Sequence, residues 1–148
     1  MNITTGNSRK VEDPKALPDE PSIRVVLLPR DTNSQGTIFG GIILSYIDLA
    51  GAVEVGKTTR QKVVTVGIKE VSFKAPVFVG EVVSFYTTTT RVGKTSVTVH
   101  VDVEVWRQQE SIHVTEAELT FVCVDENGNP TSVVQSSKRI NRSKSKSR

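Results

Sequence analysis

One acidic residue, Asp48, interrupts an apolar segment that runs from Ile38 to Val53. If this segment is a helix, it is apolar almost all round, which is typical of a helix that protein covers on most sides. A carboxylate there costs on the order of several kcal/mol unless it is hydrogen-bonded, ion-paired or used in a reaction. Asp48 is therefore a candidate general base or nucleophile. The structural alternative is a buried acid that is hydrogen-bonded to Ser45 or to a loop amide.

A glycine pair, Gly40 and Gly41, precedes the apolar run. At the start of a helix, their backbone N–H groups could polarise a carbonyl group at the positive end of the helix dipole. The alternative is that the glycines only allow the loop to turn into the helix. Asp48 follows Gly41 by seven residues, or about 10 Å along a helix. One chain could hardly direct both groups at the same carbonyl carbon.

The remaining pattern predicts the elements that position these residues. We expect a helix over 40–56 and strands over 22–29, 63–73, 81–91, 94–106 and 112–124. Between Val97 and Val105, valines alternate with polar residues, which is typical of a sheet covered on one face. The apolar helix, about 24 Å long, matches the width of four or five strands about 4.8 Å apart. The predicted fold class is α+β, with a curved antiparallel sheet wrapped around one long central helix.

The 148 residues fit one domain, which we place at 22–135. Residues 1–21 hold three prolines and are expected to form a flexible lead, and residues 136–148 are expected to form a disordered basic tail. The six Lys and Arg of this tail exceed the net charge of +3, so the rest of the chain is acidic. The tail could contact nucleic acid, but a solvated tail is the expected role.

Three further observations bear on the compartment. The chain begins without the basic and apolar regions of a signal peptide, and its single cysteine, Cys123, cannot form an intrachain disulfide. The apolar run is shorter than the about 20 residues that a membrane span needs. We therefore expect a cytoplasmic protein with no membrane span.

Two patterns point to other chemistry but lack its context. Residues 51–58 match the phosphate-binding pattern G-x-x-x-x-G-K-[ST], yet they end a predicted helix and precede a strand, which reverses the order in a P-loop. His100, His113 and Cys123 fall on separate predicted strands without close ligand spacing. We expect them to be ordinary strand residues, and we expect no metal site.

Several motifs in order resemble the hotdog-fold acyl-CoA thioesterases, in the branch of the bacterial YciA-type and cytosolic acyl-CoA hydrolases. The resemblance extends over roughly residues 23–125. Where many hotdog thioesterases place a histidine before the glycine pair, this chain has Phe39, as the YciA-type branch does. The motifs are Asp31-Thr32-Asn33, Gly36, Phe39-Gly40-Gly41, Asp48, Val63 to Val66, Ser72 to Val77, Gly80 to Val83, Gly93 to Val97, Thr115 to Ala117 and Phe121 to Asp125.

The resemblance implies hydrolysis of fatty acyl-CoA to a free fatty acid and coenzyme A, without a metal or redox cofactor. It implies homodimers with sites at the subunit interface, and hexamers built as trimers of dimers. Asp48 of one protomer would act as general base or nucleophile on a carbonyl that Gly40 and Gly41 of the other hold. Asn33 would orient the water or the thioester. The positions implied for coenzyme A are Ser72, Lys74, Arg91, Gly93, Lys94, Thr95 and Ser96.

Two other functions remain open. One is a non-catalytic hotdog regulator that binds acyl-CoA and contacts nucleic acid through the basic tail, although the sequence has no recognisable helix-turn-helix. The other is a hotdog dehydratase of hydroxyacyl thioesters. That chemistry usually needs a histidine with an acid, and neither His100 nor His113 lies near the loop or the helix in sequence.

Overall fold

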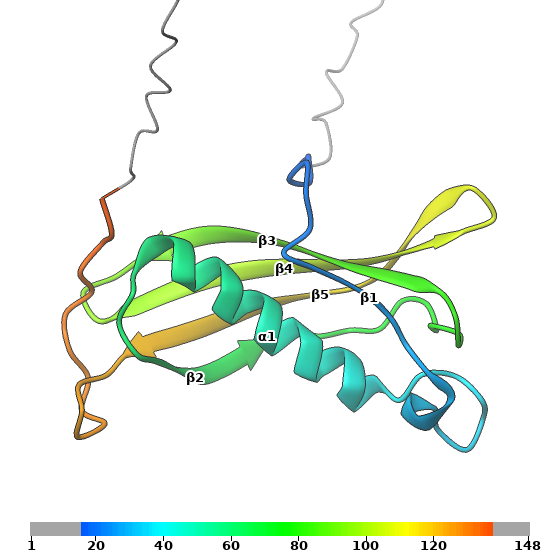
Figure 1. The fold of residues 1–148 in the computed structure, drawn as a ribbon, viewed down its shortest axis with the longest axis horizontal. Coiled ribbons are helices and arrows are strands. Elements are labelled where there is room, and N and C mark those ends of the chain that lie inside the picture. Colours follow the sequence, from blue (N-terminus) through cyan, green and yellow to red (C-terminus); the bar gives the residue numbers. More distant parts are fainter. Residues whose placement is uncertain (1–15, 138–148) are drawn as a thin grey trace, which may run out of the picture.

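The computed structural model describes residues 16–137, so the expectations for residues 1–15 and 138–148 lie outside the described residues. Five strands form one antiparallel sheet in the order β1-β3-β4-β5-β2 (Figure 1). The elements are β1 (Ile23–Val26), a 3-10 turn η1 (Pro29–Asp31), α1 (Gly40–Thr58), β2 (Val63–Lys69), β3 (Val82–Val92), β4 (Ser96–Arg107) and β5 (Glu110–Cys123).

The helix lies across one face of the curved sheet (Figure 1) and packs mainly on β3 and β4. Alternate side chains of β4 are buried beneath it, as the valine pattern predicts. Ile43 and Ile47 of α1 are also buried, and they join those valines in one core. Since burial of apolar area is the main favourable contribution to folding, this contact holds the helix in place. The predicted α+β architecture is confirmed.

Some predicted boundaries are wrong by a few residues. The second strand ends at Lys69 rather than at residue 73, because Glu70 has a φ of 58° and leaves the extended conformation. The chain nevertheless continues beside β5, where the Lys74 amide donates to the Val114 carbonyl at 2.8 Å. The first strand ends at Val26, and α1 continues beyond residue 56 to Thr58.

The side of α1 that faces away from the sheet is apolar and uncovered within one chain. Leu49 is 56% exposed and Val53 is 46% exposed. The neighbouring edge strand β2 also has exposed apolar residues, Val64, Val66 and Ile68, of which Ile68 pairs with the buried Leu119 and so lies on the helix face. The expectation that protein covers the helix on most sides is therefore not met by a single chain, and an apolar surface of this kind usually marks an interface. No helix in the described part of the chain has the length and hydropathy to cross a membrane.

Candidate active site

Asp48 lies on α1 where the helix meets the edge strand β2. Its Oδ1 accepts a hydrogen bond from the Thr65 hydroxyl at 2.6 Å. Thr65 pairs with the buried Phe121 of β5, so its side chain points to the same face of the sheet as the helix. The alternative partner, Ser45, instead donates to the Ile42 carbonyl within the helix. The acid is thus fixed by one hydroxyl and is partly exposed on the uncovered side of α1.

Glu54, a second acid of α1, has different surroundings and a structural role. It accepts hydrogen bonds from the hydroxyls of Thr87 and Thr89 at 3.0 and 3.1 Å, and Lys57 Nζ lies 2.8 Å away. Burial opposes ionisation of Glu54, but the Lys57 and Thr87 donors outweigh it and lower its pKa below the ordinary 4.5. Glu54 therefore ties the helix to β3, whereas no cation is paired with Asp48 among the described residues.

The first turn of α1 presents the backbone N–H groups of Gly40 and Gly41. The N-cap residue is Phe39, whose side chain makes no capping hydrogen bond, and the first turn contains no acid. These amides can therefore receive an oxygen from a ligand. A Cβ on Gly41 would collide with the Phe39 ring, so the close contact with Phe39 requires glycine at that position. The polarising role predicted for the glycine pair is compatible with this geometry.

Asn33 occupies the loop that leads to the helix start. Its Oδ1 accepts from the amides of Gln35 and Thr37 at 2.9 and 3.2 Å, and its Nδ2 donates to the Thr37 hydroxyl at 2.8 Å. This is the turn chemistry typical of asparagine. The loop is anchored at the helix start, because the Phe39 amide donates to the Asp31 carbonyl at 2.8 Å. Asn33 therefore belongs to the same end of the helix as the glycine pair.

A cavity of about 380 Å³ lies beside the helix start. Its lining is mainly apolar, with one cationic side chain, Lys74, and an acyl chain or pantetheine arm would fit such a surface. The lining residues are Ile38, Gly40, Ile43, Phe73, Lys74, Ala75, Pro76 and Val77.

The positions implied for coenzyme A fall into two separate groups. Ser72 and Lys74 lie beside β5, where the Ser72 carbonyl accepts from the Thr115 hydroxyl at 3.0 Å and Lys74 Nζ lies 3.7 Å from Glu116 Oε1. Arg91, at the end of β3, is exposed. The others form the turn between β3 and β4, which lies at the end of the sheet away from the start of α1 (Figure 1). They are Gly93, Lys94 and Thr95 of the turn, and Ser96, the first residue of β4.

The structure of one chain does not bring all these groups together. Asn33, Gly40, Gly41 and Lys74 gather near the helix start, while Asp48 is about 10 Å farther along the axis. The sequence reasoning missed Thr65, because its pairing with Asp48 depends on how β2 lies against the helix. The alternation of β2 residues could only have indicated that Thr65 faces inward.

The phosphate-binding pattern, Cys123 and the two histidines, to which we assigned no function, can now be located in the structure. Residues 51–58 lie inside α1 and form no phosphate-binding loop. Cys123 is buried at the end of β5, and burial raises the pKa of its thiol above the ordinary 9.0, which disfavours the reactive thiolate. His100 and His113, however, both lie near Asp102 on the outer face of the sheet, a proximity that the sequence spacing did not indicate.

Comparisons with known proteins agree with this fold. A family model described as the thioesterase superfamily matches residues 35–112. The uncharacterized acyl-CoA thioester hydrolase ZMO0511 of Zymomonas mobilis is 36% identical over 125 residues, 82% of this chain and 83% of that protein. The acyl-CoA thioester hydrolase YciA of Escherichia coli is 36% identical over 115 residues, 73% of this chain and 86% of that protein.

A solved structure shares the architecture as well as the sequence pattern. Cj0915 of Campylobacter jejuni, a hexameric hotdog fold thioesterase, is 42% identical with a TM-score of 0.73, and the match covers 78% of this chain and 90% of that one. The expected resemblance and the hotdog fold are confirmed. The chain belongs to the thioesterase superfamily.

Proposed function

We propose that this protein hydrolyses acyl-CoA thioesters to a free fatty acid and coenzyme A. The observation that carries the proposal is the position of Asp48. It is the one acid on the uncovered apolar side of α1, and the Thr65 hydroxyl orients it at 2.6 Å. No cation of the described residues is paired with it, so its carboxylate remains available to take a proton or to attack a carbonyl.

The reaction needs a polarised carbonyl and an activated nucleophile. The Gly40 and Gly41 amides hold the thioester oxygen and stabilise the negative charge that develops on it. Asp48 either removes a proton from the attacking water or attacks the carbonyl carbon itself and forms a transient anhydride. In both routes the carbon–sulfur bond breaks, the coenzyme A thiolate leaves and takes up a proton, and one water is consumed. Asn33 orients the water or the thioester through its amide.

The site is completed by a second copy of the chain. Asp48 and the glycine amides of one chain lie too far apart along α1 to act on the same carbon. The exposed apolar surface of Leu49, Val53 and the edge strand β2 supplies a self-complementary contact for a homodimer. In this dimer, Asp48 of one protomer acts on a carbonyl held by the helix start of its partner. Dimers associate further into a hexamer, the assembly named for Cj0915.

The two groups of coenzyme A positions follow from the same arrangement. Lys74 is half-exposed and its contact with Glu116 is a long one of 3.7 Å, so its ammonium group can turn toward a phosphate. Lys94 lies in the turn at the opposite end of the sheet and is exposed. A coenzyme A molecule that crosses the dimer contact meets Lys74 of one chain and the turn of the other. Coenzyme A enters as part of the substrate, and the proposal requires no separate cofactor.

The rival functions have less support. A dehydratase would need a histidine near Asp48, but His100 and His113 lie on the opposite face of the sheet from α1. A regulator would use the basic residues 138–148, which lie outside the described residues. We propose that the protein works in the cytoplasm, where the lone thiol of Cys123 would stay reduced.

The proposal is tested by thiol release from a panel of acyl-CoA substrates of different chain lengths. We expect release of one coenzyme A thiol per thioester consumed, with the free acid as the second product. Hydration of an enoyl-CoA and salt-dependent DNA binding are measured on the same sample. No thiol release above background from any member of the panel would refute the proposal, and either of the other two signals alone would favour the corresponding rival.

A further inference from the structure

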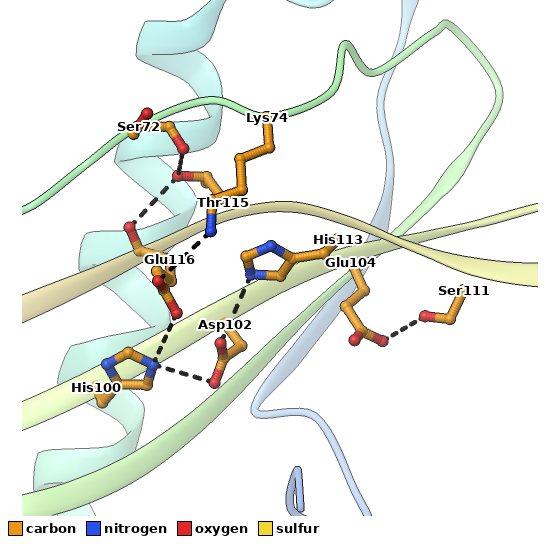
Figure 2. Close-up of polar contacts among 9 residues, drawn as sticks. All are labelled: Ser72, Lys74, His100, Asp102, Glu104, Ser111, His113, Thr115 and Glu116. Atoms are coloured by element: carbon orange, nitrogen blue, oxygen red, sulfur yellow. Dashed lines mark hydrogen bonds and ion pairs between the residues drawn. The ribbon is translucent and has the colours of Figure 1, made fainter. Parts of the chain in front are cut away.

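The outer face of the sheet carries a cluster of imidazole and carboxylate groups that the hydrolase reaction does not use (Figure 2). His100 and Asp102 project from β4, and Glu116 projects from β5 directly opposite Asp102. The two neighbours of Asp102 along β4, Val101 and Val103, are buried on the other face. The cluster therefore lies across the sheet from α1 and Asp48.

Three ligand atoms of this cluster converge on one point. The His100 Nε2 atom lies 3.2 Å from Asp102 Oδ2 and 3.6 Å from Glu116 Oε2. All three groups have donor atoms within 4.8 Å of one another. Around a tetrahedral Zn²⁺ ion with bonds of about 2.0–2.2 Å, neighbouring ligands are about 3.3–3.6 Å apart. The two distances from His100 fit two edges of that tetrahedron, and the third edge, between the two carboxylate oxygens, is at most 4.8 Å. A bound ion would draw these two oxygens together and leave a fourth corner for water.

Each carboxylate also has a partner for its second oxygen (Figure 2). Asp102 Oδ1 lies 3.7 Å from His113 Nε2, and Glu116 Oε1 lies 3.7 Å from Lys74 Nζ. In metal sites, such outer partners orient the ligands and are needed for full affinity. The two contacts, at 3.7 Å, are longer than hydrogen bonds, but they place a basic side chain on the far side of each carboxylate.

The charges of the cluster favour a cation. Two carboxylates directly opposite each other on neighbouring strands repel and destabilise the pair. The side chains of His100 and Asp102 are only 27% and 19% exposed, so water screens this repulsion incompletely. A divalent ion would neutralise both acids while it takes the neutral imidazole as its nitrogen ligand.

We propose that His100, Asp102 and Glu116 bind one divalent transition-metal ion of the zinc type on the outer face of the sheet. The site joins β4 to β5 on the face of the sheet opposite Asp48, and Lys74, which contacts Glu116, also lines the cavity beside the helix start. Its imidazole nitrogen and two carboxylates suit Zn²⁺ or Co²⁺ better than Mg²⁺, which prefers an octahedron of oxygens.

The test uses the purified full-length protein after treatment with a chelator. Calorimetric titration with Zn²⁺ should show one saturable site per chain, and Zn²⁺ should raise the melting temperature because it binds the folded state. Co²⁺ should give the absorption bands of a tetrahedral complex, which Zn²⁺ abolishes. Mg²⁺ should not compete.

Variants separate this site from other carboxylates. We expect His100→Gln and Asp102→Asn to weaken Zn²⁺ binding by about a hundredfold or more, and His113→Gln to weaken it about tenfold through the lost outer contact. Glu126→Gln removes an exposed acid from the turn after β5 and should leave binding unchanged, as should Asp48→Asn. If His100→Gln or Asp102→Asn does not fold, the more exposed Glu116→Gln replaces it. Absence of saturable Zn²⁺ binding, or equal binding by all the variants, would overturn the proposal.

Discussion

The Thr65 hydroxyl donates a hydrogen bond to Asp48 across 2.6 Å, and this contact joins the edge strand β2 to the middle of α1. A hydrogen bond to a charged group contributes about 1.5–3 kcal/mol. The hydrogen bond from Thr65 therefore holds the carboxylate of Asp48 in one orientation, on the side of the helix where the partner subunit would lie.

Replacement of Thr65 by valine keeps the side-chain shape and removes this donor. We expect turnover of acyl-CoA to fall about tenfold, which corresponds to about 1.4 kcal/mol, because Asp48 is no longer fixed in the reactive orientation. Thr65→Ser keeps a hydroxyl and should restore most of the rate. Steady-state thiol release measures both variants, and equal rates for the valine and serine variants would show that the hydroxyl does not position Asp48.

Substitution of Asp48 by asparagine tests the acid itself. An amide is neutral and can neither accept the proton of a water nor form an anhydride, so we expect the turnover number to fall about a hundredfold or more. The Thr65 contact can be kept by the amide oxygen, and the fold should be unchanged by circular dichroism. Activity close to that of the unmodified protein would assign the reaction to another group.

Much of the fold could be predicted because its signals are local. The valine alternation of β4 predicts a covered face, and those valines are buried beneath α1. The end of β2 could not be predicted, since it depends on the φ of 58° at Glu70, a residue type that gives no such signal. The length of the link between Arg107 and Glu110 does predict a hairpin, but not the positive φ values of 49° and 65° at Gln108 and Gln109, which have no glycine.

The candidate site was predictable only in part, for a similar reason. Asp48 stands out within its own segment, because an acid in an apolar run is visible in the sequence. Thr65 and the cluster around Asp102 are visible only when strands are brought together. Asp102 faces Glu116 because the hairpin turn and a bulge beside Val103 set the register of β4 against β5. The spacing of residues along one strand cannot reveal a cluster whose side chains come from two strands.

The two glycines in the second half of α1 should respond in opposite ways to alanine. A Cβ on Gly51 would lie 2.8 Å from the Phe121 ring, whereas a Cβ on Gly56 meets nothing within 4 Å in its own chain. We expect Gly51→Ala to lower the free energy of unfolding by about 1–3 kcal/mol through overpacking, and Gly56→Ala to raise it by about 0.5–1 kcal/mol through helix propensity. Thermal denaturation at a fixed protein concentration measures both, and shifts in the same direction would contradict the packing of Gly51 on Phe121.

Stability should depend on pH through Glu81. Its carboxylate accepts from Arg107 Nε and Nη2 at 2.6 and 2.8 Å, and this guanidinium holds the pKa of Glu81 below the ordinary 4.5. A pKa lowered by folding means that the ionised pair stabilises the folded state above about pH 4.5 and loses this effect as the pH falls through the lowered value. Glu81→Gln should therefore cost about 1 kcal/mol near neutral pH and almost nothing in acid. Urea unfolding at neutral and acid pH measures this difference in the free energy of unfolding.

The control for this measurement is Glu126→Gln, which removes an exposed acid from the turn after β5. Its difference from the unmodified protein should be small at every pH. A Glu81→Gln cost that persists unchanged in acid would mean that the substitution acts through packing, and that the ion pair contributes no stability.

Mixed oligomers test whether two chains share each site. In a dimer of one Asp48→Asn protomer and one Asn33→Ala protomer, one site carries both changes, and the other combines an unmodified Asp48 with the partner's unmodified Asn33. Each variant alone has no unmodified site. Co-expression with two affinity tags yields mixed oligomers, in which each dimer of two different variants should have about half the activity of an unmodified dimer. The mixture should therefore be clearly more active than either parent, which stays near background. If each site were built from one chain, every site in the mixture would carry one change, and the mixed dimers would be as inactive as the parents.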